Sequence, residues 1–361
     1  MKRVLVTGAG GTPSKNFIQS LREAPESFHL IGVDADKYYL CRAETDEKFL
    51  VPHANDNLYL DVLIDILGET KAEFIHAQPD AEVFVISKNR NKLGVLSFLP
   101  IHKTVEICQS KLESYIMWKK AGLKVPETIK INNEEDLKKA FVKLGKPLWI
   151  RAIYSSGAGR GSLRVDKYHM AKAWIDFYDG WGNFIASEYL SLQTVTWMSI
   201  WKDGELLIAQ GRKRLYWELA SRAPSGVTGI TGAGVTVSDP TVDEIAQGAI
   251  FAIDKNPSGI FSVDMTYDAN AVPNPTEINI GRFFTTHYFF TKAGLNMPYI
   301  YVKLAYGEKP PKIEKRINPL PPDLCWIRGV DFIPNLTTTE QISKHEEEYK
   351  IRISKIKGNT C

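Results

Sequence analysis

The sequence has few cysteines, no long apolar run and almost no net charge, and each scarcity excludes a class of protein. Its four cysteines, Cys41, Cys108, Cys325 and Cys361, are scattered singly. This spacing excludes paired zinc ligands and a dense disulfide framework. No apolar stretch approaches the ~20 residues that a bilayer crossing needs, so we expect no membrane partner.

The charges are too evenly balanced for a nucleic-acid partner. Lys and Arg number 45 and Asp and Glu 42, which leaves a net charge of +3, whereas nucleic-acid binding would call for a dense basic stripe. Met1, Lys2 and Arg3 lead directly into a short strand rather than into the apolar region of a signal peptide, so we expect a cytoplasmic protein. The 361 residues predict two or three packed units, and a homodimer is the commonest assembly for such a protein.

The first hundred residues alternate short apolar runs with helical periodicity, which predicts a parallel sheet covered by helices. The strand Val4 to Val6 leads into a turn with Gly8, Gly10 and Gly11, and a helix follows from Phe17 to Leu21. A second run, HLIGVDAD, ends in Asp34 and Asp36, at about the spacing of the ribose-binding acid of a dinucleotide fold. NAD is therefore one interpretation of this region.

The rest of the chain to about Gly307 mixes helices with antiparallel strands, which predicts an α+β region. The expected helices are Leu112 to Lys120, the segment NNEEDLKKAFVKLG, Tyr168 to Tyr178 and Thr241 to Ile253. The expected strands are Pro147 to Ile153, Leu163 to Val165, Phe184 to Tyr189, Val195 to Trp201 and Leu206 to Gln210. The remaining tail is rich in proline and charge and can either wrap the preceding domain or contact a partner.

A glycine-rich loop and a strand end are candidates for nucleotide binding. In PLWIRAIYSSGAGRGSLRV, a strand delivers Arg151, and the loop holds, among others, Ser156, Gly157, Gly159 and Gly161. Glycines let backbone N–H groups approach anionic oxygens closely, although a mobile surface hairpin would have the same composition. In FIASEYL, Glu188 and the backbone of Tyr189 and Leu190 present an acceptor and donor pattern suited to an adenine edge, or the strand is only core.

A hairpin further along predicts a magnesium site. In FSVDMTYDANAVPNPTEINIGRF, two strands flank a turn-rich segment and place Asp264 beside Glu277. Asn279 lies two residues after Glu277 and therefore shares its face. Three converging oxygen ligands suit Mg²⁺, which takes a few carboxylates plus phosphate oxygens and water. The alternative is an exposed polar face of the hairpin.

Basic and acidic residues elsewhere are candidates for substrate binding. Arg212 and Arg214 share a strand face, where they would hold a substrate carboxylate or a phosphate, unless the strand is merely solvated. In HAQPDAE, Asp80 and Glu82 would touch an amine substrate, or Asp80 caps a helix. The aromatic residues that would shape a pocket, if they are not core, are Tyr216, Trp217, His287 and Tyr288.

The order of these elements resembles the ATP-grasp superfamily, above all the ATP-grasp unit of the carbamoyl-phosphate synthetase large subunit and similar stand-alone carboxylate–amine ligases. The resemblance covers roughly residues 1–305. It implies a Rossmann-like preATP-grasp domain (1–106), a central lid (107–190), a catalytic subdomain (191–307) and a C-terminal extension (308–361). The first domain of this family usually binds no dinucleotide, and GAGGTPSK lacks the third spaced glycine of G-x-G-x-x-G, so NAD becomes the minor alternative.

The resemblance also implies roles for individual residues, with ATP and Mg²⁺ as cofactors. Lys111 and Arg151 correspond to the basic residues that reach the phosphates, and the residues Ser156, Gly157, Gly159 and Gly161 to the phosphate loop. Glu188, Tyr189 and Leu190 correspond to the adenine-contacting hinge. The magnesium ligands correspond to Asp264, Glu277 and Asn279, and Arg282 corresponds to the residue that meets the transferred phosphate. These assignments rest on motif matches in the sequence.

The implied reaction is the ATP-dependent ligation of a small carboxylate to an amine or a thiol through an acyl phosphate, with catalytic roles for Arg151, Arg282, Arg212 and Arg214. Two alternatives remain, a phosphotransferase similar to carbamoyl-phosphate synthetase and a nucleotide-binding regulatory protein. The sequence departs from the family at two places. SLQTVTW lacks the ribose-binding acid expected after the hinge, and E-I-N-I-G-R is one residue longer than the common E-x-N-P-R.

Overall fold

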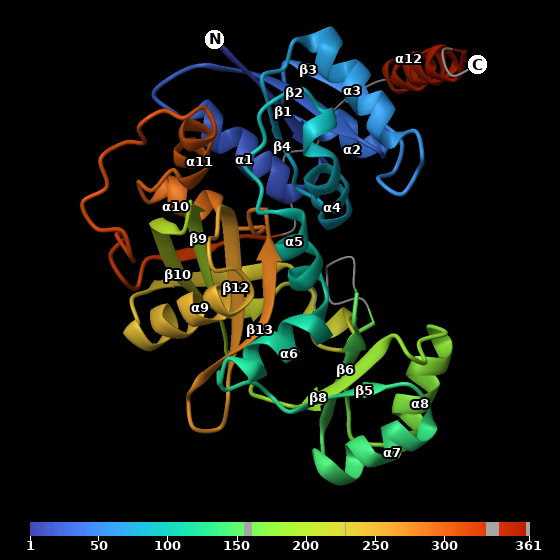
Figure 1. Ribbon diagram of the computed structural model, residues 1–361, viewed down its shortest axis with the longest axis vertical. Helices are drawn as coiled ribbons and strands as arrows, with labels where there is room; N and C mark the ends of the chain where they lie inside the picture. The colour runs from blue at the N-terminus through green and yellow to red at the C-terminus, as the bar shows by residue number, and fades with distance from the viewer. Residues whose placement is uncertain (155–160, 228, 330–338, 359–361) are drawn as a thin grey trace.

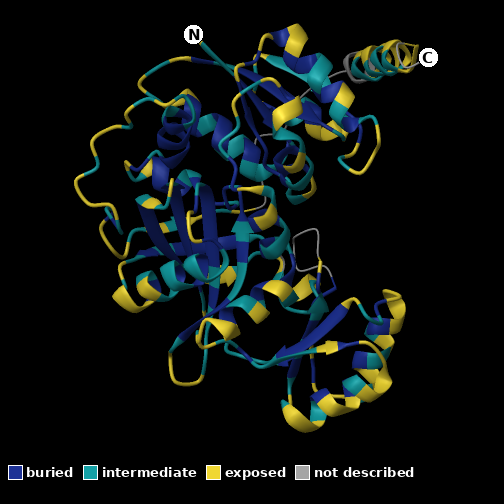
Figure 2. Cartoon of the chain, viewed as in Figure 1, coloured by how far each residue is buried: buried dark blue, intermediate teal, exposed yellow. Residues whose placement is uncertain are grey.

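The computed structural model describes residues 1–154, 161–227, 229–329 and 339–358, and the side chains of all of these except 339–342. Three sheets, each with its own covering helices, are arranged along the long axis of the molecule (Figure 1). Burial follows this plan, because the buried residues gather along the strands and the inner helix faces (Figure 2). The fold is thus the α/β and α+β mixture that the sequence predicts.

The first sheet is four-stranded and parallel, with strand order β3-β2-β1-β4. Its central strand β1 is buried at Val4, Leu5 and Val6 because helices cover both faces. The strands are β1 (Lys2–Thr7), β2 (Phe28–Asp34), β3 (Glu47–Leu50) and β4 (Phe74–His76). The helices are α1 (Thr12–Arg22), α2 (Lys37–Arg42), α3 (Tyr59–Thr70), α4 (Asp80–Asn89) and the short η1 (Arg90–Lys92).

The glycine turn after β1 is shaped by packing within this unit. Gly8 has φ +53°, and a Cβ on Gly10 would lie 1.7 Å from the carbonyl oxygen of Tyr39 in α2. The N–H of Gly10 donates to Asp34 at 3.0 Å, so this carboxylate ties the turn to β2. Asp36 instead caps α2 by accepting from the N–H groups of Tyr38 and Tyr39. Both acids of the NAD interpretation therefore have structural partners.

The second sheet is antiparallel, with strand order β5-β8-β6-β7, and two helices pack on one face of it (Figure 1). Its strands are β5 (Thr128–Ile131), β6 (Leu148–Ala152), β7 (Leu163–Val165) and β8 (Phe184–Glu188). The covering helices are α7 (Glu134–Lys143), which Asn133 caps as the sequence predicts, and α8 (Tyr168–Phe177). Two preceding helices, α5 (His102–Gln109) and α6 (Lys111–Lys120), connect this sheet to the rest of the molecule.

The third sheet is six-stranded and antiparallel, in the order β13-β12-β9-β10-β11-β14. Its strands are β9 (Thr194–Lys202), β10 (Glu205–Trp217), β11 (Thr231–Val237), β12 (Gly259–Tyr267), β13 (Pro273–Ile280) and β14 (Cys325–Ile327). The accompanying helices are η2 (Ala220–Arg222), α9 (Pro240–Ile253), α10 (Tyr288–Lys292) and α11 (Met297–Ala305). Trp118 of α6 donates its indole N–H to the carbonyl of Ala249 in α9 at 3.0 Å, which joins the connecting helices to this layer.

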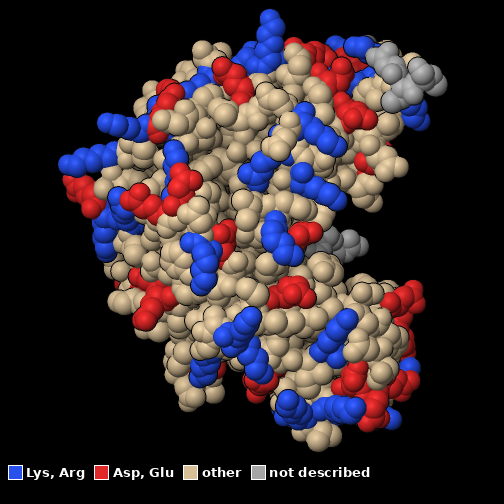
Figure 3. Space-filling view, viewed as in Figure 1, with Lys and Arg blue, Asp and Glu red and all other residues tan. Residues whose placement is uncertain are grey.

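The described part of the tail wraps the molecule. Strand β14 pairs with β11 at the edge of the third sheet, and α12 (Thr339–Gly358) packs against the first unit. Arg352 of α12 donates to Asp65 and Glu69 of α3 at 2.5 and 2.6 Å. Basic and acidic side chains are interspersed over the face in Figure 3, and within the described residues no helix combines the length and apolar character needed to cross a bilayer.

Candidate active site

A cavity of about 610 Å³ lies where the three sheets meet. The ends of β1 and β4 contribute one wall, the second sheet contributes another, and β10, β12 and β13 contribute the third. Its charged lining residues are Asp80, Lys111, Arg151, Glu188, Arg212, Arg214, Asp264, Glu277 and Arg282. The structure therefore brings most of the sequence-predicted site residues together around one volume.

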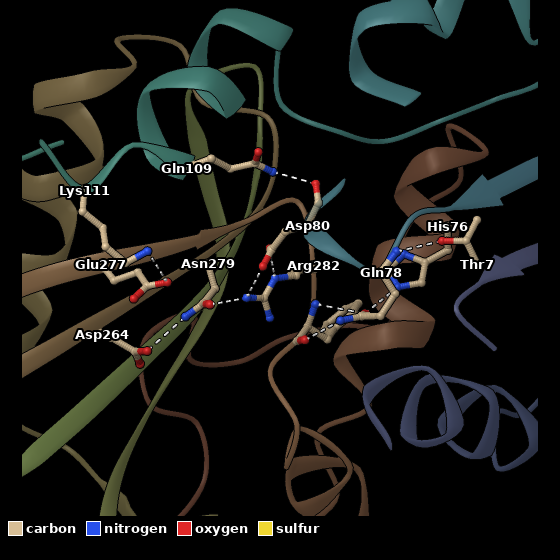
Figure 4. Close-up of polar contacts among 11 residues, drawn as sticks. Thr7, His76, Gln78, Asp80, Gln109, Lys111, Asp264, Glu277, Asn279 and Arg282 are labelled. Atoms are coloured by element: carbon tan, nitrogen blue, oxygen red, sulfur yellow. Dashed lines mark hydrogen bonds and ion pairs between the residues drawn. The ribbon is translucent and has the colours of Figure 1, made fainter. Parts of the chain in front are cut away.

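The predicted magnesium ligands converge as the hairpin pattern predicts. Asp264 on β12 is paired in register with Glu277 on β13, and Asn279 donates its amide N–H to Asp264 Oδ2 at 3.0 Å (Figure 4). The other oxygen of Asp264 accepts from the hydroxyl of Thr196 on β9. Two carboxylates and an amide oxygen are hard donors that suit Mg²⁺.

These three residues would not enclose an ion by themselves. Nowhere in the described ranges do three His, Cys, Asp or Glu side chains gather closely enough to hold a metal ion. A divalent cation here would take Asp264, Glu277 and Asn279 together with oxygens of a bound nucleotide, which is the usual way in which proteins bind Mg²⁺. The donor set therefore fits a metal that arrives with phosphates.

Two cations face Glu277 from different elements. Lys111 Nζ, at the start of α6, lies 3.6 Å from Glu277 Oε1, and Arg151 Nη1 on β6 lies 3.9 Å from Glu277 Oε2. Burial raises the pKa of Glu277, but the positive charges of Lys111, Arg151 and Arg282 lower it by more, so the net shift is downward. Arg151 is anchored by a 2.8 Å hydrogen bond from Nη2 to the carbonyl of Thr276.

Arg282 pairs with the first unit. Its Nε and Nη2 donate to the two oxygens of Asp80, the first residue of α4, and its Nη2 also donates to Asn279 Oδ1 at 2.5 Å (Figure 4). The predicted helix cap is wrong, because Pro79 is the N-cap residue of α4 and the carboxylate of Asp80 pairs with Arg282. The predicted amine contact stays a prediction. The prediction for Glu82 is wrong: Glu82 is 5% exposed and lies outside the cavity lining, because α4 turns that position toward its own core.

Arg212 and Arg214 share one face of β10, as the strand spacing predicts, and both donate to the hydroxyl of Thr231 at 2.9 and 3.0 Å. Their remaining bonds go to Thr196 and Thr194. Burial lowers the pKa of Arg212 to about 9 and that of Arg214 to about 10, so both stay charged at neutral pH. Within the described residues neither guanidinium has an ion pair, which leaves this face available to an anion.

The residues of the predicted hinge lie at the cavity. Glu188, Tyr189 and Leu190 all line it, and Glu188 Oε2 accepts from the N–H of Glu127 at 2.9 Å. The side chain of Glu188 therefore joins the end of β8 to the residue before β5. After the hinge, Ser191, Leu192 and Thr194 line the cavity where the family has a ribose-binding acid.

The phosphate loop is described only in part. Ser156, Gly157 and Gly159 lie outside the described residues. Gly161 has φ +75°, and a Cβ added to it would lie 3.4 Å from Ala152 and 3.5 Å from Phe184. Gly161 is absent from the cavity lining, whereas its neighbour Ser162 belongs to it. The structure thus places Gly161 as a turn residue at the base of the hairpin.

Of the four aromatic candidates, only Trp217 lines the cavity, where its ring lies 3.4 Å from the Arg214 guanidinium carbon. Tyr216 is half exposed, His287 is buried in the core, and Tyr288 donates to Glu23. Tyr216 and Tyr288 are absent from the cavity lining, so their predicted role in the pocket is wrong, whereas for His287 the alternative interpretation, a core residue, is confirmed. The sequence also missed Trp149 and Phe284, which line it; an aromatic on a strand carries no signal of which layer will cover it.

No family model matches the sequence, and no curated protein matches it significantly. Solved structures match over most of the chain. The N5-carboxyaminoimidazole synthetase of Staphylococcus aureus is 16% identical over 86% of this chain and 78% of its own, with a TM-score of 0.63. The biotin carboxylase domain of the Hydrogenobacter thermophilus 2-oxoglutarate carboxylase, in complex with MgADP, ADP and bicarbonate, is 16% identical over 90% and 73%, with a TM-score of 0.67.

A third structure, the L-amino acid ligase of Bacillus licheniformis, is 14% identical over 84% of this chain and 74% of its own, with a TM-score of 0.65. All three neighbours are ATP-grasp enzymes. Likeness at this level of identity establishes the fold, and the fold agrees with the one that the sequence resemblance predicts. This chain therefore has the ATP-grasp fold.

Proposed function

We propose that the protein is an ATP-dependent ligase that activates a small carboxylate as an acyl phosphate and transfers the acyl group to an amine. The observation that carries the proposal is the convergence of Asp264, Glu277 and Asn279 with Lys111 and Arg151, from separate elements, on one cavity. The cavity thus holds carboxylates that can bind a metal ion and cations that can bind phosphate groups. This combination suits phosphoryl transfer, which depends on positioning and on stabilisation of charge. The MgADP bound to the biotin carboxylase domain of Hydrogenobacter thermophilus supports a nucleotide in this cavity.

The proposed division of labour follows the three sheets. The unit at 1–106 would hold part of the acceptor substrate, the lid at 107–190 would cover the nucleotide, and the unit at 191–307 would hold the metal and the reacting groups, with the 308–361 extension bracing them. Bound Mg²⁺ would offset charge on the phosphates. Lys111 and Arg151 would bind phosphate oxygens, and Arg282 would face the transferred group.

Arg212 and Arg214 would orient the substrate carboxylate or the acyl phosphate. Their guanidinium groups are fixed by Thr231 on one side and by Phe284 and Trp217, whose rings lie 4.7 and 3.4 Å from the respective guanidinium carbons. Fixed, partly desolvated cations are effective stabilisers of developing negative charge. The walls of the cavity would also exclude water from an intermediate that hydrolysis would waste.

The test measures phosphate release from ATP and Mg²⁺ against a panel of carboxylic acids, with and without amines or thiols. Acid-dependent release that Glu277→Gln lowers about 10²-fold or more, with ATP-driven product formed only when an amine is present, would support the ligase. Glu135→Gln, which neutralises an exposed carboxylate in the first turn of α7, is the matched control. Release that stops at an acyl phosphate would favour the phosphotransferase, and ATP binding without release for any acid would favour a regulatory protein.

A further inference from the structure

The segment after β4 is bound to the segment after β13 by hydrogen bonds and an ion pair. The Gln78 amide donates to the carbonyl of Phe283 at 2.8 Å, and its oxygen accepts from the N–H of Phe283 at 3.3 Å (Figure 4). Two residues along, Asp80 binds Arg282. The first unit thus contacts the residues that directly follow the metal-binding strand, through two adjacent polar connections.

Asp80 is itself held in place. Its carbonyl oxygen accepts from Gln109 Nε2 of α5 at 2.7 Å, and it opens α4 immediately after Pro79. Its side chain is about one quarter exposed and lines the cavity. A carboxylate on such a fixed base can orient a flexible arginine with little further loss of side-chain freedom.

The contacts of Arg282 leave one nitrogen, with two N–H donors, for a ligand. Nε and Nη2 bond to Asp80, and Nη2 also bonds to Asn279. Within the described residues Nη1 has no hydrogen-bond partner, and in Figure 4 it points away from both. Because the guanidinium is planar, fixing two of its nitrogens fixes the direction of the third.

We propose that Asp80 is a positioning residue, which holds Arg282 against Asn279 and keeps its guanidinium away from the carboxylates of Asp264 and Glu277. Glu277 and Asp264 also attract this guanidinium, so an Arg282 that lost Asp80 would turn toward the two carboxylates. It would then compete with a divalent cation for them. The inference deepens the proposed function and rests on it only for the step that consumes ATP.

The experiment compares wild type with Asp80→Asn, Asp80→Glu, Arg282→Gln and the Asp80→Asn/Arg282→Gln double variant. Asp61→Asn, which removes an exposed carboxylate from the first turn of α3, is the control. At saturating Mg²⁺ we expect Asp80→Asn to lower the rate of ATP-dependent phosphate release about 10²-fold with little change in the KM for ATP. Asp80→Glu should recover at least part of that loss, and the double variant should be no slower than Arg282→Gln alone, because both changes act through one group.

A second readout needs no turnover. The Mg²⁺ concentration that half-saturates ADP binding should rise several-fold in Asp80→Asn and return to the wild-type value in the double variant, which lacks the competing guanidinium. Additive effects in the double variant, or a Mg²⁺ dependence equal to that of Asp61→Asn, would overturn the proposal. A wild type that binds MgADP but never releases phosphate would refute the ligase function, while the Mg²⁺ titration would still decide the role of Asp80. If Asp80→Asn fails to fold, the same titration on Asp80→Ser, which also lacks the carboxylate, decides, and a wild-type value there overturns the proposal.

Discussion

Glu82 gives the folding of this protein a specific pH dependence. Its side chain is 5% exposed and, within the described structure, its Oε2 has no hydrogen-bond partner. Burial, with a smaller contribution from the nearby charge of Asp34, raises the pKa of Glu82 from 4.5 to about 8. Between pH 4.5 and pH 8, Glu82 therefore keeps its proton in the folded protein and has lost it in the unfolded chain.

The sign and size follow from proton linkage. Because the folded state binds the extra proton, the contribution of Glu82 to stability is highest below pH 4.5, falls as pH rises toward 8, and levels off above it. The difference between the two pKa values corresponds to a loss of about 5 kcal/mol in the free energy of unfolding, at about 1.4 kcal/mol per pKa unit. For a chain of this length that is a shift of about 6 °C in Tm if unfolding is cooperative.

Glu82→Gln should remove this dependence. The Tm of Glu82→Gln, compared with that of wild type by calorimetry from pH 5 to pH 9, should gain about 5 °C on wild type across the range, because pH 5 already lies above the lower pKa. Glu113→Gln, an exposed carboxylate in the first turn of α6, is the control and should track wild type. A constant difference in Tm between Glu82→Gln and wild type at every pH would refute the reasoning.

Three further predictions follow from the cavity and the glycine turn. Arg212→Gln should raise the KM for the acid substrate at least about tenfold and leave the affinity for ATP within about twofold of wild type, both measured by phosphate release. Lys213→Gln, on the other face of the strand, is the control. Equal losses of affinity for the acid and for ATP would contradict a substrate role for Arg212. Because Ser191, Leu192 and Thr194 line the cavity where the family has an acid, 2′-deoxy-ATP should bind within about fivefold of ATP in calorimetry. A larger loss, beyond the ~1 kcal/mol of one hydrogen bond, would contradict this. Gly10→Ala should lower the free energy of unfolding by about 3 kcal/mol or more, because its Cβ would clash with the Tyr39 carbonyl. Gly68→Ala in α3 is the control and should cause no such loss, because no atom lies within 4 Å of the added Cβ. A Gly10→Ala protein as stable as wild type would show that α2 can move to make room for the methyl group.

The sequence predicts the elements best where local pattern and tertiary environment agree. Leu163 to Val165 is a strand with the predicted bounds, and Asn133 caps α7 as expected. Strand β10 was predicted too short, because Arg212 and Arg214 interrupt its apolar pattern, yet β9 and β11 pair with it on both sides. The three-residue β14 lies in a proline-rich tail and forms only because β11 offers it an edge.

The same distinction separates the parts of the site. Asp264, Glu277 and Asn279 could be predicted as a group because one hairpin brings them together, so the strand period decides which of them share a face. The pair of Asp80 with Arg282 joins positions 202 residues apart, and no local spacing encodes it. For the same reason the sequence predicts Glu188 at the hinge but not that its carboxylate is bound to the backbone of Glu127.

The distances in the cavity indicate which ion pairs a nucleotide would exchange. Lys111 and Arg151 lie 3.6 and 3.9 Å from Glu277, beyond hydrogen-bond length, whereas Arg282 is hydrogen-bonded to Asp80. Phosphate oxygens would therefore replace Glu277 as the partner of the first two cations, and the freed carboxylate would serve the metal that arrives with them. Since such an exchange conserves charge, nucleotide and Mg²⁺ should bind cooperatively, each raising the affinity for the other by the same factor. Measuring the Kd of ADP at several Mg²⁺ concentrations, and of Mg²⁺ at several ADP concentrations, tests this cooperativity, which Glu277→Gln should abolish.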